Sequence, residues 1–303
     1  KVAYDANGGS GAPETQEKTH GTALTLSSTK PQKTGYDFKG WATKNNATSV
    51  EYAAGATYST NSAIKLYAIW EPKVCTIKLD NMGATSPGTK EIYLKYNTGY
   101  YLDKECTKQI SLYSGRITNP EQMGYNFGGY YIGKEGTGLS IITSGGGLSS
   151  AATKTLFTDN ATIYAKWNIK SSSITVNPGG AKYTQNYGTT KQISAPAQSY
   201  KVTLNANGGS VSTTTLTSTR NFTRWTLVNG GSINSNTANP VTYTYGEKDA
   251  TLTASYASTG NAVTLPTPQR NSSYEFLGWY DGETKVNNSY SPSKDVTLVA
   301  KWR

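Results

Sequence analysis

The chain has 303 residues and a formal net charge of +10, although only 16% of its residues are charged and 35% are hydrophobic. That apolar share is low beside the roughly 45–50% of an ordinary globular chain, and it is rich in rings, with 23 Tyr and 6 Trp. The composition argues against one large aliphatic core. The sequence contains no Lys/Arg-rich run of the kind found in tails that bind nucleic acids. It also contains no apolar run of the ~20 residues needed to cross a bilayer. Several thin, ring-centred cores fit better.

The first recurring phrase is an alternating strand followed by a glycine turn. It stands at four places, residues 2–10, 77–85, 174–182 and 202–210. Asn-Gly readily takes positive φ at both central turn positions, so Asn7-Gly8 and Asn207-Gly208 predict tight turns after their strands. Self-similarity of this kind indicates a repeat protein.

The second phrase is GYDFKGW at residues 35–41. It returns as GYNFGGY at 124–130, RNFTRW at 220–225 and SYEFLGW at 273–279. Phe38 and Trp41 are three positions apart, so on a regular strand they would face opposite sides. Gly40 between them predicts a bulge or sharp bend that re-aims Trp41. One ring would then enter the core and the other would cover an edge or a neighbouring unit.

The third phrase is a closing strand, found at 65–70, 162–167, 251–256 and 297–302. Its period-2 alternation predicts a buried face, such as Leu66, Ala68 and Trp70, opposite a solvent face. The solvent face carries Tyr67, Lys166, Ser255 and Lys301. The alanine leaves a gap on the buried face, which we expect a phenylalanine of the second phrase to fill. The predicted core rings are Phe38, Trp41, Trp70, Phe127, Trp167, Phe222, Trp225, Phe276, Trp279 and Trp302.

The phrases divide the chain into repeat units 1–71 and 72–169, the second carrying an insertion, and then into units 170–257 and 258–303. The last two are irregular, because 170–199 lacks a closing strand and 258–303 lacks a first strand. Two arrangements remain open. The units are either sequential and degenerate, or 200–257 is a complete unit nested inside a split one, and we favour the nested arrangement.

Gly35, Tyr36, Phe38, Gly40 and Trp41, followed by the Leu-Tyr-Ala-x-Trp of residues 66–70, resemble the Listeria–Bacteroides repeat, which is related to the B-repeat of internalin B. Matching sets stand at 124–130 with 163–167 and at 274–279 with 298–302. The resemblance implies mainly β, β-grasp-like small units in tandem on secreted or surface-attached bacterial proteins. The sequence departs from the pattern in three places. Tyr130 and Tyr256 replace Trp, the copy at 220–225 lacks the leading Gly-Tyr and has Arg224 in place of Gly, and the second unit carries the insertion.

Residues that could support catalysis are few. His20 is the only histidine, and Cys75 and Cys106 are the only cysteines, so a catalytic triad or a zinc site lacks ligands. A disulfide between the two cysteines stays open. The sequence GGYYIGK ends in Glu135 where a phosphate-binding loop needs Ser or Thr. We therefore expect no enzyme, no cofactor and no metal.

The resemblance implies a stalk or adhesin segment, extracellular or attached to the cell surface. Its expected partner is a host or neighbouring-cell surface protein or a glycan, with neither nucleic acid nor membrane insertion involved. An alternative is a carbohydrate-binding protein, because Tyr and Trp rings stack on sugars, and the candidate contact residues are Tyr100, Tyr101, Tyr130 and Tyr131. A further alternative is self-association into a filament, since an edge strand can accept another chain.

Overall fold

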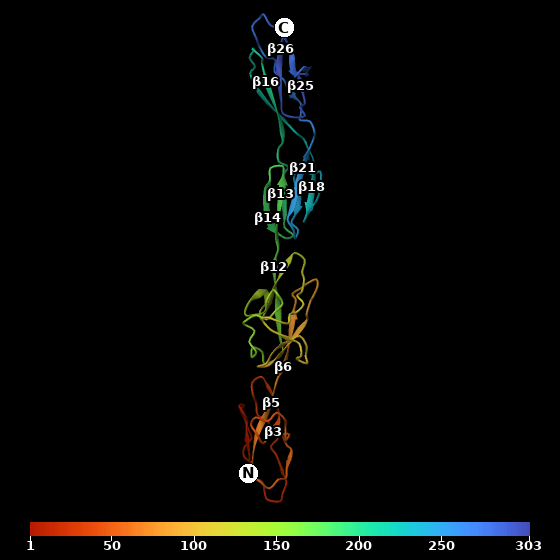
Figure 1. Cartoon of the computed structure of the whole chain (residues 1–303). Helices are drawn as coiled ribbons and strands as arrows, with labels where there is room; N and C mark the ends of the chain where they lie inside the picture. Colours follow the sequence, from red (N-terminus) through yellow and green to blue (C-terminus); the bar gives the residue numbers. More distant parts are fainter. The chain divides into compact units, whose positions relative to one another are not determined.

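Alternating β-formers separated by glycine turns give a structure that is almost entirely β, which confirms the predicted mainly β fold class (Figure 1). The structure is a computed structural model and describes residues 1–303. The chain divides into two compact units, residues 1–168 and 169–303. The only helix is a 3-10 turn, η1 (Lys134–Gly136), so no helix has the length or apolar character needed to span a membrane.

Four separate hydrophobic clusters form the core, and each one defines a module. Modules 1 and 2 follow one another along the chain. Module 1 contains β1 (Val2–Asp5), β2 (Leu24–Thr25), β3 (Tyr36–Ala42), β4 (Thr57–Tyr58) and β5 (Ile64–Pro72). Module 2 contains β6 (Val74–Asp80), β7 (Glu91–Lys95), β8 (Gly99–Tyr101), β9 (Gln109–Ile110), β10 (Tyr125–Tyr131), β11 (Ser140–Ile142) and β12 (Ala161–Ile169).

Modules 3 and 4 share the rest of the chain. Module 3 contains β13 (Ser171–Asn177), β14 (Ala181–Asn186), β15 (Thr190–Ile193), β18 (Phe222–Asn229), β19 (Ser232–Ile233), β20 (Val241–Thr244) and β21 (Ala250–Tyr256). Module 4 contains β16 (Ser199–Asn205), β17 (Thr215–Thr219), β22 (Val263–Thr264), β23 (Phe276–Asp281), β24 (Thr284–Lys285), β25 (Ser289–Tyr290) and β26 (Val296–Trp302).

Every module pairs its first strand in parallel with its closing strand. The pairs are β1 with β5, β6 with β12, β13 with β21, and β16 with β26. The strand of the second phrase lies on the other side of the closing strand, as in the sheet order β1-β5-β3. Parallel neighbours need a crossover connection, and the second phrase is part of that crossover.

The predicted bulge is present at Gly40. The register of β3 against β5 shifts between Phe38 and Gly40, and Gly40 has a φ of 150°. The bulge brings Phe38 and Trp41 to the same face, with ring centroids 5.0 Å apart in an edge arrangement. Trp41 is completely buried, whereas Phe38 is only half-buried. The expectation that the second ring covers an edge is therefore corrected, because Trp41 is the ring at the centre of the core.

The alanine of the closing strand accommodates tryptophan and not phenylalanine. Ala68 is the register partner of Trp41, as Ala254 is of Trp225 and Ala300 of Trp279. Phenylalanine is instead opposite the last ring of the closing strand, as Phe38 is opposite Trp70. The small side chain is needed there because the larger indole occupies the facing position.

Modules 3 and 4 are interlaced, which corrects both arrangements expected for residues 170–303. The first strand β13 pairs with β21, while the later first strand β16 pairs with β26. The chain therefore passes from module 3 to module 4, back to module 3 and again to module 4. The sequence could not decide this, because 174–177 and 202–205 share the same alternation and either could pair with either closing strand.

Arg220 holds together the three segments that pass between modules 3 and 4. Its backbone N–H donates to Gln198 O at 2.8 Å, and its guanidinium donates to Ala257 O from Nε at 2.9 Å and from one terminal nitrogen at 2.8 Å. The guanidinium lies 4.9 Å from the ring centroid of Tyr200 and 5.7 Å from that of Tyr256. Arg220 lies in one crossing segment, and its side chain thus contacts the other two through Tyr200 and Ala257.

Candidate functional site

Three of the four predicted contact tyrosines are buried and not available to a ligand, whereas the fourth keeps part of its surface exposed. Tyr100, Tyr101 and Tyr130 are only 1%, 8% and 0% exposed, and Tyr131 is half-buried. The insertion of module 2 does not project as a loop. It forms β8 and β9, which extend the sheet beyond β7, so that Tyr100 turns into the core and its hydroxyl donates to Thr153 O at 3.2 Å. Burial raises the pKa of Tyr100.

The predicted core rings all lie in or against the four hydrophobic clusters. Trp41, Trp225 and Trp279 are buried, whereas the tryptophans that end closing strands are half-buried. Each half-buried indole donates its N–H at 3.0 Å to a carbonyl of the turn after the first strand. These bonds are Trp70 to Ala6 O, Trp167 to Asn81 O and Trp302 to Ala206 O. The predicted Phe127, Phe222 and Phe276 pack against clusters of modules 2, 3 and 4.

The residues considered for catalysis lie apart from one another. His20 is exposed, and no group of three or more metal-ligating side chains exists in the structure. Cys75 is buried and Cys106 is half-buried, and both are free thiols. Desolvation raises the pKa of the Cys75 thiol, so it is protonated and unreactive at neutral pH.

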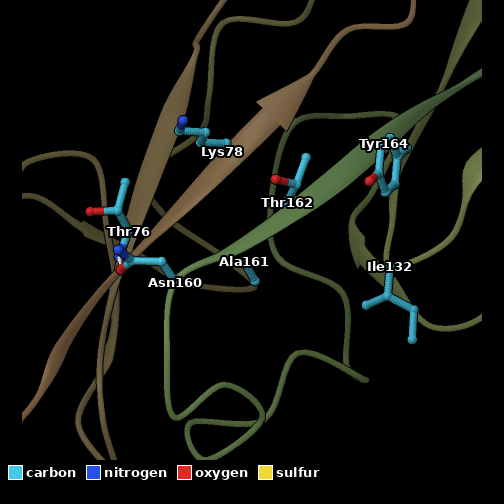
Figure 2. A pocket seen from close by; sticks show the side chains of 7 residues that line it. All are labelled: Thr76, Lys78, Ile132, Asn160, Ala161, Thr162 and Tyr164. Carbon is cyan, nitrogen blue, oxygen red and sulfur yellow. Dashed lines mark hydrogen bonds between the residues drawn. The ribbon is translucent and has the colours of Figure 1, made fainter.

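A shallow hollow of about 630 Å³ lies on the outer face of module 2, over strands β6 and β12 (Figure 2). Tyr164 and Ile132 stand at one end, and Thr76 and Asn160 stand at the other (Figure 2). Lys78 and Thr162 lie between them, and Ala161 completes the lining. We call this hollow the β6–β12 groove. Strand alternation places Lys78, Thr162 and Tyr164 outside, because Ile77 and Ile163 on the same strands point into the core.

The charge in the β6–β12 groove is positive. Lys78 is exposed and makes no ion pair, and Lys134 Nζ lies 5.7 Å from the ring centroid of Tyr164. An ammonium group near an aromatic face is attracted to the ring quadrupole. The groove therefore combines a cationic edge, a phenol ring and two threonine hydroxyls, which is a set that binds polar ligands but holds no nucleophile with an adjacent base.

Asn160 at the end of the groove has a structural role. Its Oδ1 accepts the backbone N–H of Thr76 at 2.8 Å, which joins the start of β12 to β6. Asp249 does the same for Ser173 and Asp295 for Lys201, each at 2.8 Å. An Asn or Asp directly before the closing strand is a signal that the sequence carries and that our sequence analysis missed.

Comparison with known proteins supports the predicted resemblance. Residues 1–69 and 227–301 match the Listeria-Bacteroides repeat domain family. The second match begins within β18 and ends in β26, so it covers parts of both interlaced modules.

Two proteins of Evansella cellulosilytica are similar to this chain. A protein named "putative membrane protein" is 23% identical over 99% of this chain and 43% of its own length. Another, named "putative Gly-rich membrane protein", is 28% identical over 61% of this chain and 18% of its own length. The chain thus spans less than half the length of these relatives. No solved structure matches it.

Proposed function

We infer, from the Listeria-Bacteroides repeats at residues 1–69 and 227–301, that this chain is a segment of a bacterial surface repeat protein, and we propose that it is a non-catalytic stalk or adhesin segment outside the cell. The observation that supports a stalk is the parallel pairing of first and closing strands in every module. Tension along the chain would pull these two neighbours in opposite directions along their length, so the hydrogen bonds between them would be loaded together and not one after another.

The connections between successive modules also suit the transmission of tension. Only Lys73 separates the closing strand β5 from the first strand β6, and only Lys170 separates β12 from β13. The chain thus passes from one sheet to the next without a long linker. A long flexible linker would extend before tension reached the next module.

Pulling experiments on the full chain test the stalk proposal. In module 1 the parallel register runs from Val2 with Ile64 to Asp5 with Tyr67. Attachment at residues 1 and 73 shears this ladder, whereas attachment at residues 1 and 63 opens it from one end, bond by bond. We expect module 1 to unfold at a clearly higher force in the first geometry. Equal forces in both would contradict the proposal.

A second candidate function is polysaccharide binding at the β6–β12 groove, favoured by the exposed Lys78 and the ring of Tyr164. We expect Tyr164→Leu to weaken binding of a polysaccharide found on a glycan array by roughly three- to tenfold, in line with the worth of one aromatic stacking contact. Tyr113→Leu is the matched control, because Tyr113 is 92% exposed in the same module and lies outside the groove. Equal binding by both variants and the parent chain would exclude the groove.

A further inference from the structure

A cation stacked on two rings marks a second kind of surface hollow, in module 4. The guanidinium carbon of Arg270 lies 3.6 Å from the ring centroid of Tyr274 and 5.8 Å from that of Trp302. Its NH1 lies 3.5 Å from Asn207 O, at the limit of a hydrogen bond. The hollow measures about 660 Å³ and is also lined by Gly208, Gly209, Ser210, Gln269 and Asn271.

Module 1 contains the same arrangement. Lys33 Nζ lies 4.8 Å from the ring centroid of Tyr36, 5.8 Å from that of Trp70 and 3.5 Å from Asn7 O. The adjoining hollow measures about 1040 Å³, and Ser10 and Gln32 line it. The supporting hydrogen bonds also correspond. Ser10 N donates to Gln32 O at 2.8 Å in module 1, and Ser210 N donates to Gln269 O at 2.7 Å in module 4.

Neither stacked cation is neutralised by a carboxylate. The ion pairs nearby involve other residues, since Lys39 pairs with Glu71 at 2.8 Å and Lys73 lies 3.9 Å from Asp159. Lys30 adds a further unpaired ammonium group to the module 1 hollow, where Asp37 and Asp159 are the acidic residues. Lys33 and Arg270 therefore each place a positive charge that makes no ion pair next to aromatic rings.

The arrangement is confined to two of the four modules. In module 2 the position of Lys33 is taken by Gln122, whose Oε1 is buried and lacks a hydrogen-bond partner. In module 3 the cation near the closing ring Tyr256 is Arg220, but its guanidinium donates two hydrogen bonds to Ala257 O and so is engaged within the protein. Lys33 and Arg270 thus form a specific pair of sites and not a general property of the surface.

We propose that these two hollows bind an acidic polysaccharide, with its carboxylate or sulfate groups at Lys33 and Arg270 and its sugar rings against the neighbouring aromatic side chains. Stacking limits the motion of the cation before binding, so less side-chain entropy is lost when the anion arrives. A polymer that repeats its charge can offer an acidic group to either of the two sites. The proposal is independent of load bearing and of the β6–β12 groove.

Binding of the full chain to polygalacturonate, to heparin and to neutral dextran tests the proposal. We expect the first two to bind and dextran not to bind, and the affinity to fall as salt is raised. The double variant Lys33→Ala/Arg270→Ala should lower the affinity about tenfold or more. The control Lys44→Ala/Lys294→Ala removes the same charge from exposed positions of modules 1 and 4 outside the hollows, and it should change the affinity less than threefold.

The comparison of carboxylated with sulfated polymer identifies the preferred acidic group. An equal loss in both double variants would mean that only net charge matters and would overturn the proposal, as would binding to neither acidic polymer. Tighter binding of duplex DNA than of either polysaccharide would also overturn it. Thermal unfolding of each variant checks that the modules remain folded, and Lys33→Arg with Arg270→Lys should largely retain binding.

Discussion

Trp225→Ala is expected to lower the free energy of unfolding by roughly 3–5 kcal/mol, the range for a buried large aromatic side chain, and to unfold module 4 together with module 3. Trp225 is 2% exposed at the centre of the module 3 cluster, and its indole N–H donates to Ala238 O at 3.0 Å. Module 4 should follow because three chain segments join the two modules. When β18 and β21 lose their packing, the segments that position β16 and β26 are released as well.

Hydrogen exchange resolved by segment measures this effect. In Trp225→Ala, amides of β13 and β16 should lose protection together, whereas amides of module 1 should keep theirs. Trp41→Ala provides the comparison, because Trp41 is equally buried in the unit of residues 1–168 and should leave residues 169–303 protected. Full protection of β16 and β26 in Trp225→Ala would show that the interlaced modules unfold independently.

Alternation alone could not identify which tryptophan of a module is buried at the centre of its core. The pattern of residues 65–70 places Trp70 on the buried face, and the sequence therefore suggests it as a core residue. In the structure Trp70 is at the end of its strand, half-buried, with its N–H used to hold a turn. Trp41 becomes the central ring because the bulge at Gly40 rotates it inward, and the sequence predicted the bulge but not which ring it would bury.

Strand identity was predictable, but strand partnership in residues 169–303 was not. The three phrases correctly mark first strands, second-phrase strands and closing strands. Which first strand pairs with which closing strand depends on packing between segments distant in the sequence, and the local patterns at 174–177 and 202–205 are interchangeable. The same limitation explains why Tyr100 was wrongly predicted to be an exposed contact residue, since its exposure depends on the sheet that the insertion joins.

The sequence shows only part of the two sites at Lys33 and Arg270. The sequence shows Lys33 three positions before Tyr36 and Arg270 four positions before Tyr274. It does not show that Trp70 and Trp302, more than 30 residues further along the chain, lie beside these cations. The overall charge of +10 is compatible with acidic partners, but a net charge does not locate a site.

Arg220→Met should destabilise modules 3 and 4 together, by about 2–3 kcal/mol. The change removes the two hydrogen bonds from the guanidinium to Ala257 O, and bonds of a charged donor contribute about 1.5–3 kcal/mol. It also removes the contacts with the rings of Tyr200 and Tyr256, worth about 0.5–1 kcal/mol at exposed sites. Methionine retains much of the apolar length of the side chain, so the loss reports on the polar contacts.

Arg224→Met is the matched control, because Arg224 carries the same charge four residues away on β18 and is exposed. Substitution there should change the free energy of unfolding by less than about 0.5 kcal/mol, as expected for a surface site without special contacts. Urea unfolding of the full chain and segment-resolved hydrogen exchange together separate the two variants. If Arg220→Met behaved like Arg224→Met, the crossing segments would be held by their backbone hydrogen bonds alone, such as Ala257 N to Asn221 O. The cooperative unfolding expected of Trp225→Ala would then have to be transmitted by the backbone of these segments without help from the Arg220 side chain.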